Sequence, residues 1–309
     1  MSAKLIAVAN MKGGVGKTAT VVSIAETLAA RAIDKSSKSR TPPKPILVVD
    51  LDAQASASFA LAGNDLLTAL IRDGKTVDGF LDRYFLRGSD QELADFIQCQ
   101  VSAVTHGEDP LSIDLLASSP DLRKLERGLI HALTSKGFSL AEIEDATYDL
   151  LASRIAKLTP SYDYIIFDCP PGISILTEVA IRIADLTIVP TIPDFLSVLG
   201  LDAFEQNVWS QLATTAAANA TPLKAPYVLV TKRKNLKIHN LTVAELRKRV
   251  ENGKVKYDIF DTEIPESQDV PKAVELIESF PTYSHKWGNM RTQLSDLAAE
   301  IETALKRRR

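Results

Sequence analysis

The sequence predicts an α/β fold, in which a mostly parallel, twisted sheet carries helices on both faces. Short and almost wholly apolar segments, typical of strands that are buried on both sides, alternate with longer segments of helical periodicity. Several of the apolar segments run directly into an acidic residue or a glycine-rich loop, as strands do at the ligand-binding edge of such sheets. The chain has 309 residues, of which 45% are apolar, and we expect one domain over residues 1–309.

The expected strands lie in the order of the chain and are separated by helical segments. Their apolar composition places them at Lys4–Asn10, Ile46–Asp50, Tyr164–Asp168, Leu186–Pro190 and Tyr227–Thr231. A glycine-rich loop follows the first strand, and a helix is expected to begin at Lys17. The polar, proline-containing segment Asp34–Pro45 is expected to be a loop.

The middle of the chain, at about residues 60–160, is expected to be a mostly helical elaboration of the domain. It contains one strand-like segment, Ser112–Ala117. The segment Phe195–Ala218 has helical composition. A C-terminal helix is expected to turn one apolar face to the core, formed by Leu294, Leu297, Ala298, Ile301 and Leu305.

Composition excludes several classes of protein. The net charge of −3 and the pI of about 5.9 exclude a globally basic nucleic-acid binder, so any such binding needs a local patch. Cys99 and Cys169 have neither metal-ligand spacing nor the pattern of a disulfide framework, which favours a cytoplasmic location. No apolar run is long enough to predict a transmembrane helix.

The segment Lys12–Thr18, KGGVGKT, follows the first expected strand and has the chemistry of a phosphate-binding loop. Its glycines allow backbone N–H groups to surround phosphate oxygens, and the next helix adds the positive end of its dipole. Lys17 can neutralise phosphates, and the Thr18 hydroxyl can bind Mg²⁺. The residues expected to hold the nucleotide are Gly13, Gly14, Val15, Gly16, Lys17, Thr18 and Ala19.

This loop resembles the deviant Walker A motif of the ParA/MinD ATPases, which are P-loop NTPases of the SIMIBI class. Met11 stands where the ordinary motif begins with glycine, and Lys12 stands where the family has its signature lysine. The resemblance implies ATP and Mg²⁺ as cofactors. It also implies a homodimer that forms when ATP is bound, in which Lys12 acts catalytically on the phosphates of the partner subunit.

Two acidic segments resemble the other motifs of this family. In VVDLDAQAS, the resemblance implies that Asp52 orients or activates the attacking water, that Asp50 supports the metal shell and that Gln54 lines the site. In DYIIFDCPPG, it implies that Asp168 holds Mg²⁺ through a water. Lys12, Lys17 and Asp52 are therefore the candidate catalytic residues, and Thr18, Asp50 and Asp168 the candidate metal-binding residues.

Two later segments supply candidates for binding the base and DNA. By resemblance, Thr231, Lys232, Pro265 and Glu266 contact the base. Residues 232–256 contain nine basic residues and only two acidic ones. The candidate DNA-binding residues, which would contact phosphates irrespective of sequence, are Lys232, Arg233, Lys234, Arg247, Lys248 and Arg249.

Together these features predict a ParA-like, Mg²⁺-dependent ATP hydrolase that is slow and stimulated by a partner. It would bind DNA non-specifically as an ATP-dependent dimer, and would partition or position a plasmid, chromosome or protein cargo on the nucleoid. A ParB-like or other adaptor is the expected activator, and no membrane is expected. The alternatives are a MinD-like ATPase at a membrane surface and a small-molecule P-loop enzyme. Acidic residues in the last helix argue against the first.

Overall fold

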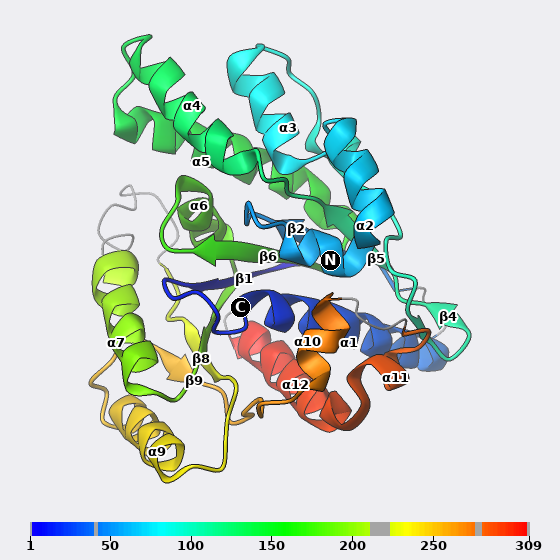
Figure 1. The fold of residues 1–309 in the computed structure, drawn as a ribbon, viewed down its shortest axis with the longest axis vertical. Coiled ribbons are helices and arrows are strands. Elements are labelled where there is room, and N and C mark those ends of the chain that lie inside the picture. The colour runs from blue at the N-terminus through cyan, green and yellow to red at the C-terminus, as the bar shows by residue number, and fades with distance from the viewer. Residues whose placement is uncertain (1, 40–42, 211–222, 276–279, 308–309) are drawn as a thin grey trace.

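The computed structural model describes residues 2–39, 43–210, 223–275 and 280–307. These residues form a seven-stranded sheet of order β5-β2-β6-β1-β7-β8-β9, which is parallel throughout (Figure 1). Its strands are β1 (Lys4–Asn10), β2 (Ile46–Asp50), β5 (Ile113–Leu116), β6 (Tyr164–Pro171), β7 (Leu186–Thr191), β8 (Tyr227–Val230) and β9 (Asp258–Ile259). The predicted fold class is confirmed, and every predicted strand is present.

Helices cover both faces of the sheet (Figure 1). One face packs against α1 (Lys17–Ser39), α2 (Ser56–Arg72), α10 (Asp269–Glu275), α11 (Tyr283–Trp287) and α12 (Arg291–Arg307). The other packs against α3 (Val77–Leu81), α5 (Leu140–Leu158), α6 (Ile175–Ile183), α7 (Phe195–Phe204) and α9 (Lys237–Glu251). Helix α4 (Leu122–Thr134) packs on α5 and completes the outer part of this second layer.

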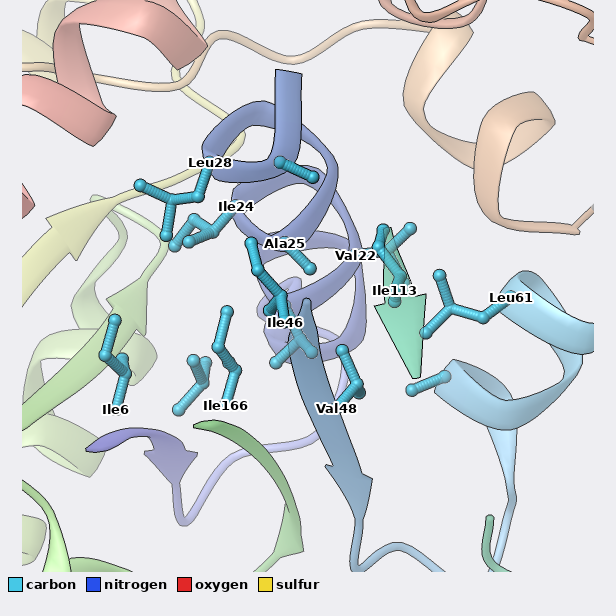
Figure 2. Packing of buried hydrophobic residues seen from close by; sticks show 14 of the residues in the cluster. Ile6, Val22, Ile24, Ala25, Leu28, Ile46, Val48, Leu61, Ile113 and Ile166 are labelled. Atoms are coloured by element: carbon cyan, nitrogen blue, oxygen red, sulfur yellow. The ribbon is translucent and has the colours of Figure 1, made fainter. Parts of the chain in front are cut away.

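The strands are apolar on both sides because both sides are buried. Within β1, Ile6 and Val8 belong to the core beneath α1, while Ala7 and Ala9 belong to the opposite core. Figure 2 shows the first core, where side chains of α1 and of four strands meet between helix and sheet. This double burial fixes β1 at the centre of the sheet, and so fixes the loop at its carboxyl end.

Helix α1 corrects one expectation. The predicted loop begins at Asp34, but the helix continues to Ser39. The charged side chains of its last turns find partners on neighbouring elements: Lys35 pairs with Glu302 of α12 at 2.5 Å, and Asp34 contacts His106 at 2.9 Å. The polar composition of residues 34–39 therefore reflects a helix surface that contacts neighbouring elements, and not a loop.

The middle of the chain is mostly helical and contributes to the main sheet. Its strand β5 forms one edge of the main sheet. It also contains a short hairpin that the sequence analysis missed, formed by β3 (Thr105–His106) and β4 (Asp109–Pro110). Helical turns at Asp82–Leu86, Leu93–Phe96 and Thr159–Ser161 connect its longer elements.

The two remaining helical expectations have different outcomes. The predicted apolar face of the C-terminal helix is buried at every position named for it. The segment expected over Phe195–Ala218 is helical through Ser210, with α7 continuing into a π-helical turn at Glu205–Trp209, and residues 211–218 lie outside the described structure. None of the helices within the described ranges has the length and apolarity required to cross a membrane.

Candidate nucleotide-binding site

The glycine-rich loop joins the carboxyl end of β1 to the first turn of α1. Gly14 and Gly16 have φ values of 76° and 94°, in the region that residues with a Cβ rarely adopt. The loop therefore reverses direction tightly enough to deliver the chain to a helix N-terminus within a few residues. Such an N-terminus offers free backbone N–H groups and a positive dipole end to an anion.

Asn10 fixes the start of this loop. Its buried side-chain amide donates to the carbonyl oxygen of Pro190 at 2.7 Å, which ties β1 to β7. Its side-chain oxygen accepts from the backbone N–H of Lys12 at 2.9 Å. Asn10 was not among the site residues expected from the sequence, although an amide directly before a phosphate loop is a usable signal, since Asn bonds readily to nearby backbone groups.

Lys17 lies inside the loop with its side chain largely buried. The residue is 7% exposed, and its ammonium donates to the carbonyl oxygen of Lys12 at 3.0 Å. Burial lowers the pKa of Lys17, while the nearby carboxylates of Asp168 and Asp52 oppose that shift. A phosphate bound in the loop would supply further negative charge to this ammonium.

Thr18 and Asp168 have the arrangement expected at a Mg²⁺ site. The Thr18 hydroxyl donates to Oδ2 of Asp168 at 2.8 Å, while Oδ1 of Asp168 is buried and has no protein hydrogen-bond partner. Burial, followed by the nearby Asp50, raises the pKa of Asp168. No group of three or more His, Cys, Asp or Glu residues able to hold a metal ion occurs in the described parts of the chain. A hard cation here would fit if phosphates and waters completed its shell.

Asp50 lies beside Asp168 in the register of β2 and β6, but its oxygens are already bound. Oδ1 accepts from the backbone N–H of Asp52 at 3.0 Å, and Oδ2 accepts from the N–H and hydroxyl of Ser58 at 2.8 and 2.7 Å. Burial raises the pKa of Asp50 to about 6. Asp50 therefore joins the Asp52 turn to the first turn of α2.

One cavity of about 1250 Å³ contains most of the predicted nucleotide contacts. The phosphate loop, Asp52 and Gln54 line it, and so do all four candidate base contacts, Thr231, Lys232, Pro265 and Glu266. Val15 is buried beneath the loop, where its carbonyl oxygen accepts from the Thr231 hydroxyl at 2.8 Å. The Thr231 hydroxyl thus stabilises the position of the phosphate loop through its backbone.

Lys12 is directed elsewhere. Its ammonium donates to the Ser197 hydroxyl at 2.8 Å and lies 3.5 Å from Oδ1 of Asp194. Both partners stand at the start of α7, where Asp194 is the N-cap residue. Neither residue was among those expected from the sequence, although an acid directly before a helix is an N-cap signal.

The candidate DNA contacts are largely paired with acids. Arg233 and Arg247 both contact Glu263, at 2.9 and 3.3 Å, and Lys234 contacts Glu266 at 2.9 Å. The other ion pairs of this segment are Arg247–Asp261, Arg249–Asp202 and Arg249–Glu245. Within the described ranges, Lys232 and Lys248 are exposed and form no ion pair. Positive charge therefore gathers here less strongly than the sequence alone indicates.

Comparison with known protein families and curated sequences identifies relatives of this chain. A family model described as an AAA domain matches residues 3–221. Over 206 residues the chain is 26% identical to the chromosome partitioning protein ParA of Myxococcus xanthus, covering 66% of this chain and 58% of that protein. The chain spans about three fifths of the length of the curated relatives that it matches.

Solved structures resemble the whole chain. A McdA variant from Cyanothece in complex with ATP has a TM-score of 0.64 at 18% identity, covering 99% of this chain and 97% of that one. Cobyrinic acid a,c-diamide synthase from Mycobacterium smegmatis, with bound ADP and magnesium, has a TM-score of 0.64 at 22% identity, with coverages of 99% and 97%. At these identities the likeness establishes the fold.

Proposed function

Since the chain belongs to the AAA domain family and is a ParA-family P-loop ATPase, we propose that it is an ATP-dependent dimerisation switch that binds DNA non-specifically. In that role it partitions or positions a plasmid, chromosome or protein cargo. One observation carries the proposal: the chain has a complete phosphate loop and, beside it, a second lysine directed away from its own cavity.

The loop and its neighbours fit ATP and Mg²⁺. The backbone of Gly13–Gly16 and the ammonium of Lys17 would bind the phosphates, while the Thr18 hydroxyl and Asp168, whose Oδ1 has no protein partner, would hold the cation. Bound Mg²⁺ would neutralise charge that develops on the phosphate oxygens. Asp52 lies on the same cavity and orients the attacking water.

Lys12 acts on the ATP phosphates that are bound by the second subunit of the dimer. Its side chain is 33% exposed and does not line the cavity of its own chain. A cation that arrives from another subunit stabilises charge in the transition state without affecting the resting site. Hydrolysis therefore requires two subunits, and the dimer forms only when ATP is bound.

An exposed apolar surface beside Lys12 favours a second copy as its partner. Phe195 and Leu196 on the first turn of α7 are 72% and 66% exposed. Exposed apolar side chains also lie at the start of α9, the helix whose last turn is joined to α7 by the ion pair of Arg249 with Asp202. We call this set the α7–α9 surface: Phe195, Leu196, Leu199, Leu236, Ile238 and Leu241. An apolar surface next to a lysine that acts in trans is where a dimer would be stabilised.

DNA binding is tested by fluorescence anisotropy with a duplex of arbitrary sequence. The proposal expects binding with ATP that weakens steeply as salt increases, because phosphate contacts release counterions. Lys248→Ala should weaken binding, whereas Lys124→Ala on α4 serves as a control far from that segment. Equal affinity without nucleotide, or no affinity at low salt, would contradict the DNA-binding role.

The partner and the alternatives are tested with the same protein. An adaptor of the ParB type is expected to raise the slow basal hydrolysis. Co-sedimentation with anionic liposomes only when ATP is present would favour a membrane-surface ATPase instead. Rapid turnover of a metabolite that needs neither DNA nor an activator would favour a small-molecule enzyme.

A further inference from the structure

The Lys12 ammonium is held by its own chain. It donates to the Ser197 hydroxyl at 2.8 Å and lies 3.5 Å from Oδ1 of Asp194. Ser197 is buried, whereas Lys12 and Asp194 are partly exposed. The backbone beneath the lysine is fixed as well, because Asn10 accepts from the Lys12 N–H. The lysine therefore has a defined resting position.

The same two residues begin helix α7. Oδ1 of Asp194 accepts from the backbone N–H of Ser197 at 2.7 Å and caps the helix. Burial opposes ionisation of Asp194, but hydrogen bonds from Ser197 and the charge of Lys12 prevail and lower its pKa. The lysine thus contacts an ionised carboxylate at the helix that carries the exposed Phe195 and Leu196.

The resting contact competes with the proposed contact in trans. The three donors of a lysine ammonium share a single nitrogen. This nitrogen cannot bind Ser197 and the phosphates of another subunit at the same time, so the two contacts exclude each other. Leaving the resting position costs a charge-assisted hydrogen bond, and binding ATP across a dimer replaces it. The equilibrium between monomer and dimer therefore includes this exchange.

We propose that Asp194 and Ser197 are positioning residues that retain Lys12 on its own subunit until a nucleotide-bound second copy displaces it. This inference rests on the proposed function, because it assumes that Lys12 acts across a dimer. It adds that each subunit restrains its own signature lysine, so that premature dimerisation is disfavoured.

The chain offers two clean variants. Ser197→Ala removes the hydroxyl but leaves the cap, since the cap is made by Asp194. Asp194→Asn removes the charge but keeps a good N-cap side chain. The matched control is Ser153→Ala on α5, where a serine hydroxyl bonds only to the local helix backbone.

Sedimentation velocity with a non-hydrolysable ATP analogue and Mg²⁺ measures the dimer. Each variant is expected to dimerise about three- to tenfold more tightly than wild type, with nucleotide affinity of the monomer unchanged. The control should match wild type. If both variants dimerise no more tightly than wild type, or less tightly, the restraint is disproved.

NMR of the lysine ammonium groups separates this inference from the proposed function, because it needs no dimer. In the nucleotide-free wild type, the Lys12 ammonium should exchange slowly with water, and Ser197→Ala should abolish that protection. A fast-exchanging Lys12 in wild type contradicts the resting contact. A protected Lys12 in a protein that never dimerises with ATP contradicts the proposed function instead.

Discussion

At the scale of single residues, the site depends on polar groups that neighbouring elements hold in place. Lys17 and Thr18 take their positions from the strand–loop–helix unit, whereas Asp168, which accepts from the Thr18 hydroxyl, is positioned by the neighbouring strand β6. Thr231 takes its position from β8, and its hydroxyl binds the loop carbonyl of Val15. These contacts separate residues that would touch phosphate from residues that hold the phosphate loop.

Replacing Thr231 by Val should distinguish loop positioning from base recognition. The change removes the hydrogen bond to Val15 and leaves a buried carbonyl without that donor, at a cost of about 1 kcal/mol in stability. Affinity for ATP and for GTP, measured by calorimetry, should fall by the same factor. A change in the ratio of the two affinities would show that Thr231 contacts the base.

Asp52→Ala should separate binding from hydrolysis. Because Asp52 lines the cavity without contacting Lys17, Thr18 or Asp168 by a hydrogen bond, ATP should still bind and the ATP dimer should persist. Hydrolysis, measured by phosphate release, should fall by about 100-fold or more, as for loss of a group that handles the attacking water. Asp73→Ala on the surface is the control, and unchanged hydrolysis would exclude Asp52 from catalysis.

The difference between local and distant contacts explains what the sequence could predict. The residues of Lys12–Thr18 were identifiable because their chemistry depends on neighbours within one loop. The contact of Lys12 with Ser197 joins positions 185 residues apart, and no local pattern encodes it. Oδ2 of Asp50 likewise accepts hydrogen bonds from Ser58, which lies in the next helix.

At the scale of elements, the buried strands were predictable, whereas helix ends and surfaces were not. The strands are apolar because both faces of the sheet are covered, so composition alone identifies them. The end of α1 depends on partners such as Glu302, which only the folded chain supplies. The exposed apolar residues at the start of α7 follow from packing, since periodicity does not say which side of that helix faces solvent.

Substitutions on the α7–α9 surface test its proposed role in the dimer. Leu196→Ser and Ile238→Ser each remove exposed apolar area, and each should weaken the ATP dimer by roughly tenfold if the side chain becomes buried there. ATP affinity of the monomer should stay unchanged. Leu140→Ser, at an exposed leucine of α5, is the control. An unaltered dimer in both variants would exclude this surface.

At the scale of the whole molecule, a buried charged cluster joins the C-terminal part of the chain to the helix that follows the phosphate loop. Glu26 of α1 accepts from the Lys286 ammonium at 2.7 Å and from the indole N–H of Trp287 at 2.6 Å. The two charged side chains are 1% and 2% exposed. The C-terminal helices are thereby fixed against the nucleotide-binding helix.

Lys286→Met should destabilise the protein by about 3 kcal/mol, because it leaves the Glu26 carboxylate buried without its counter-charge. Urea denaturation measures the loss. The double variant Glu26→Gln with Lys286→Met should lose less than the single one, since no isolated charge remains. A single variant as stable as wild type would show that the pair does not stabilise the fold.

The central claim is that Lys12 makes ATP binding and dimerisation interdependent, and sedimentation velocity of wild type and Lys12→Ala tests it most directly. With Mg²⁺ and a non-hydrolysable ATP analogue, wild type should form a dimer that ADP does not support. Lys12→Ala should bind the analogue with affinity within about threefold of wild type, yet remain mainly monomeric, because it lacks the cation that acts across the interface. A Lys12→Ala dimer as tight as that of wild type, or a wild-type protein that stays monomeric with the analogue, would contradict the account.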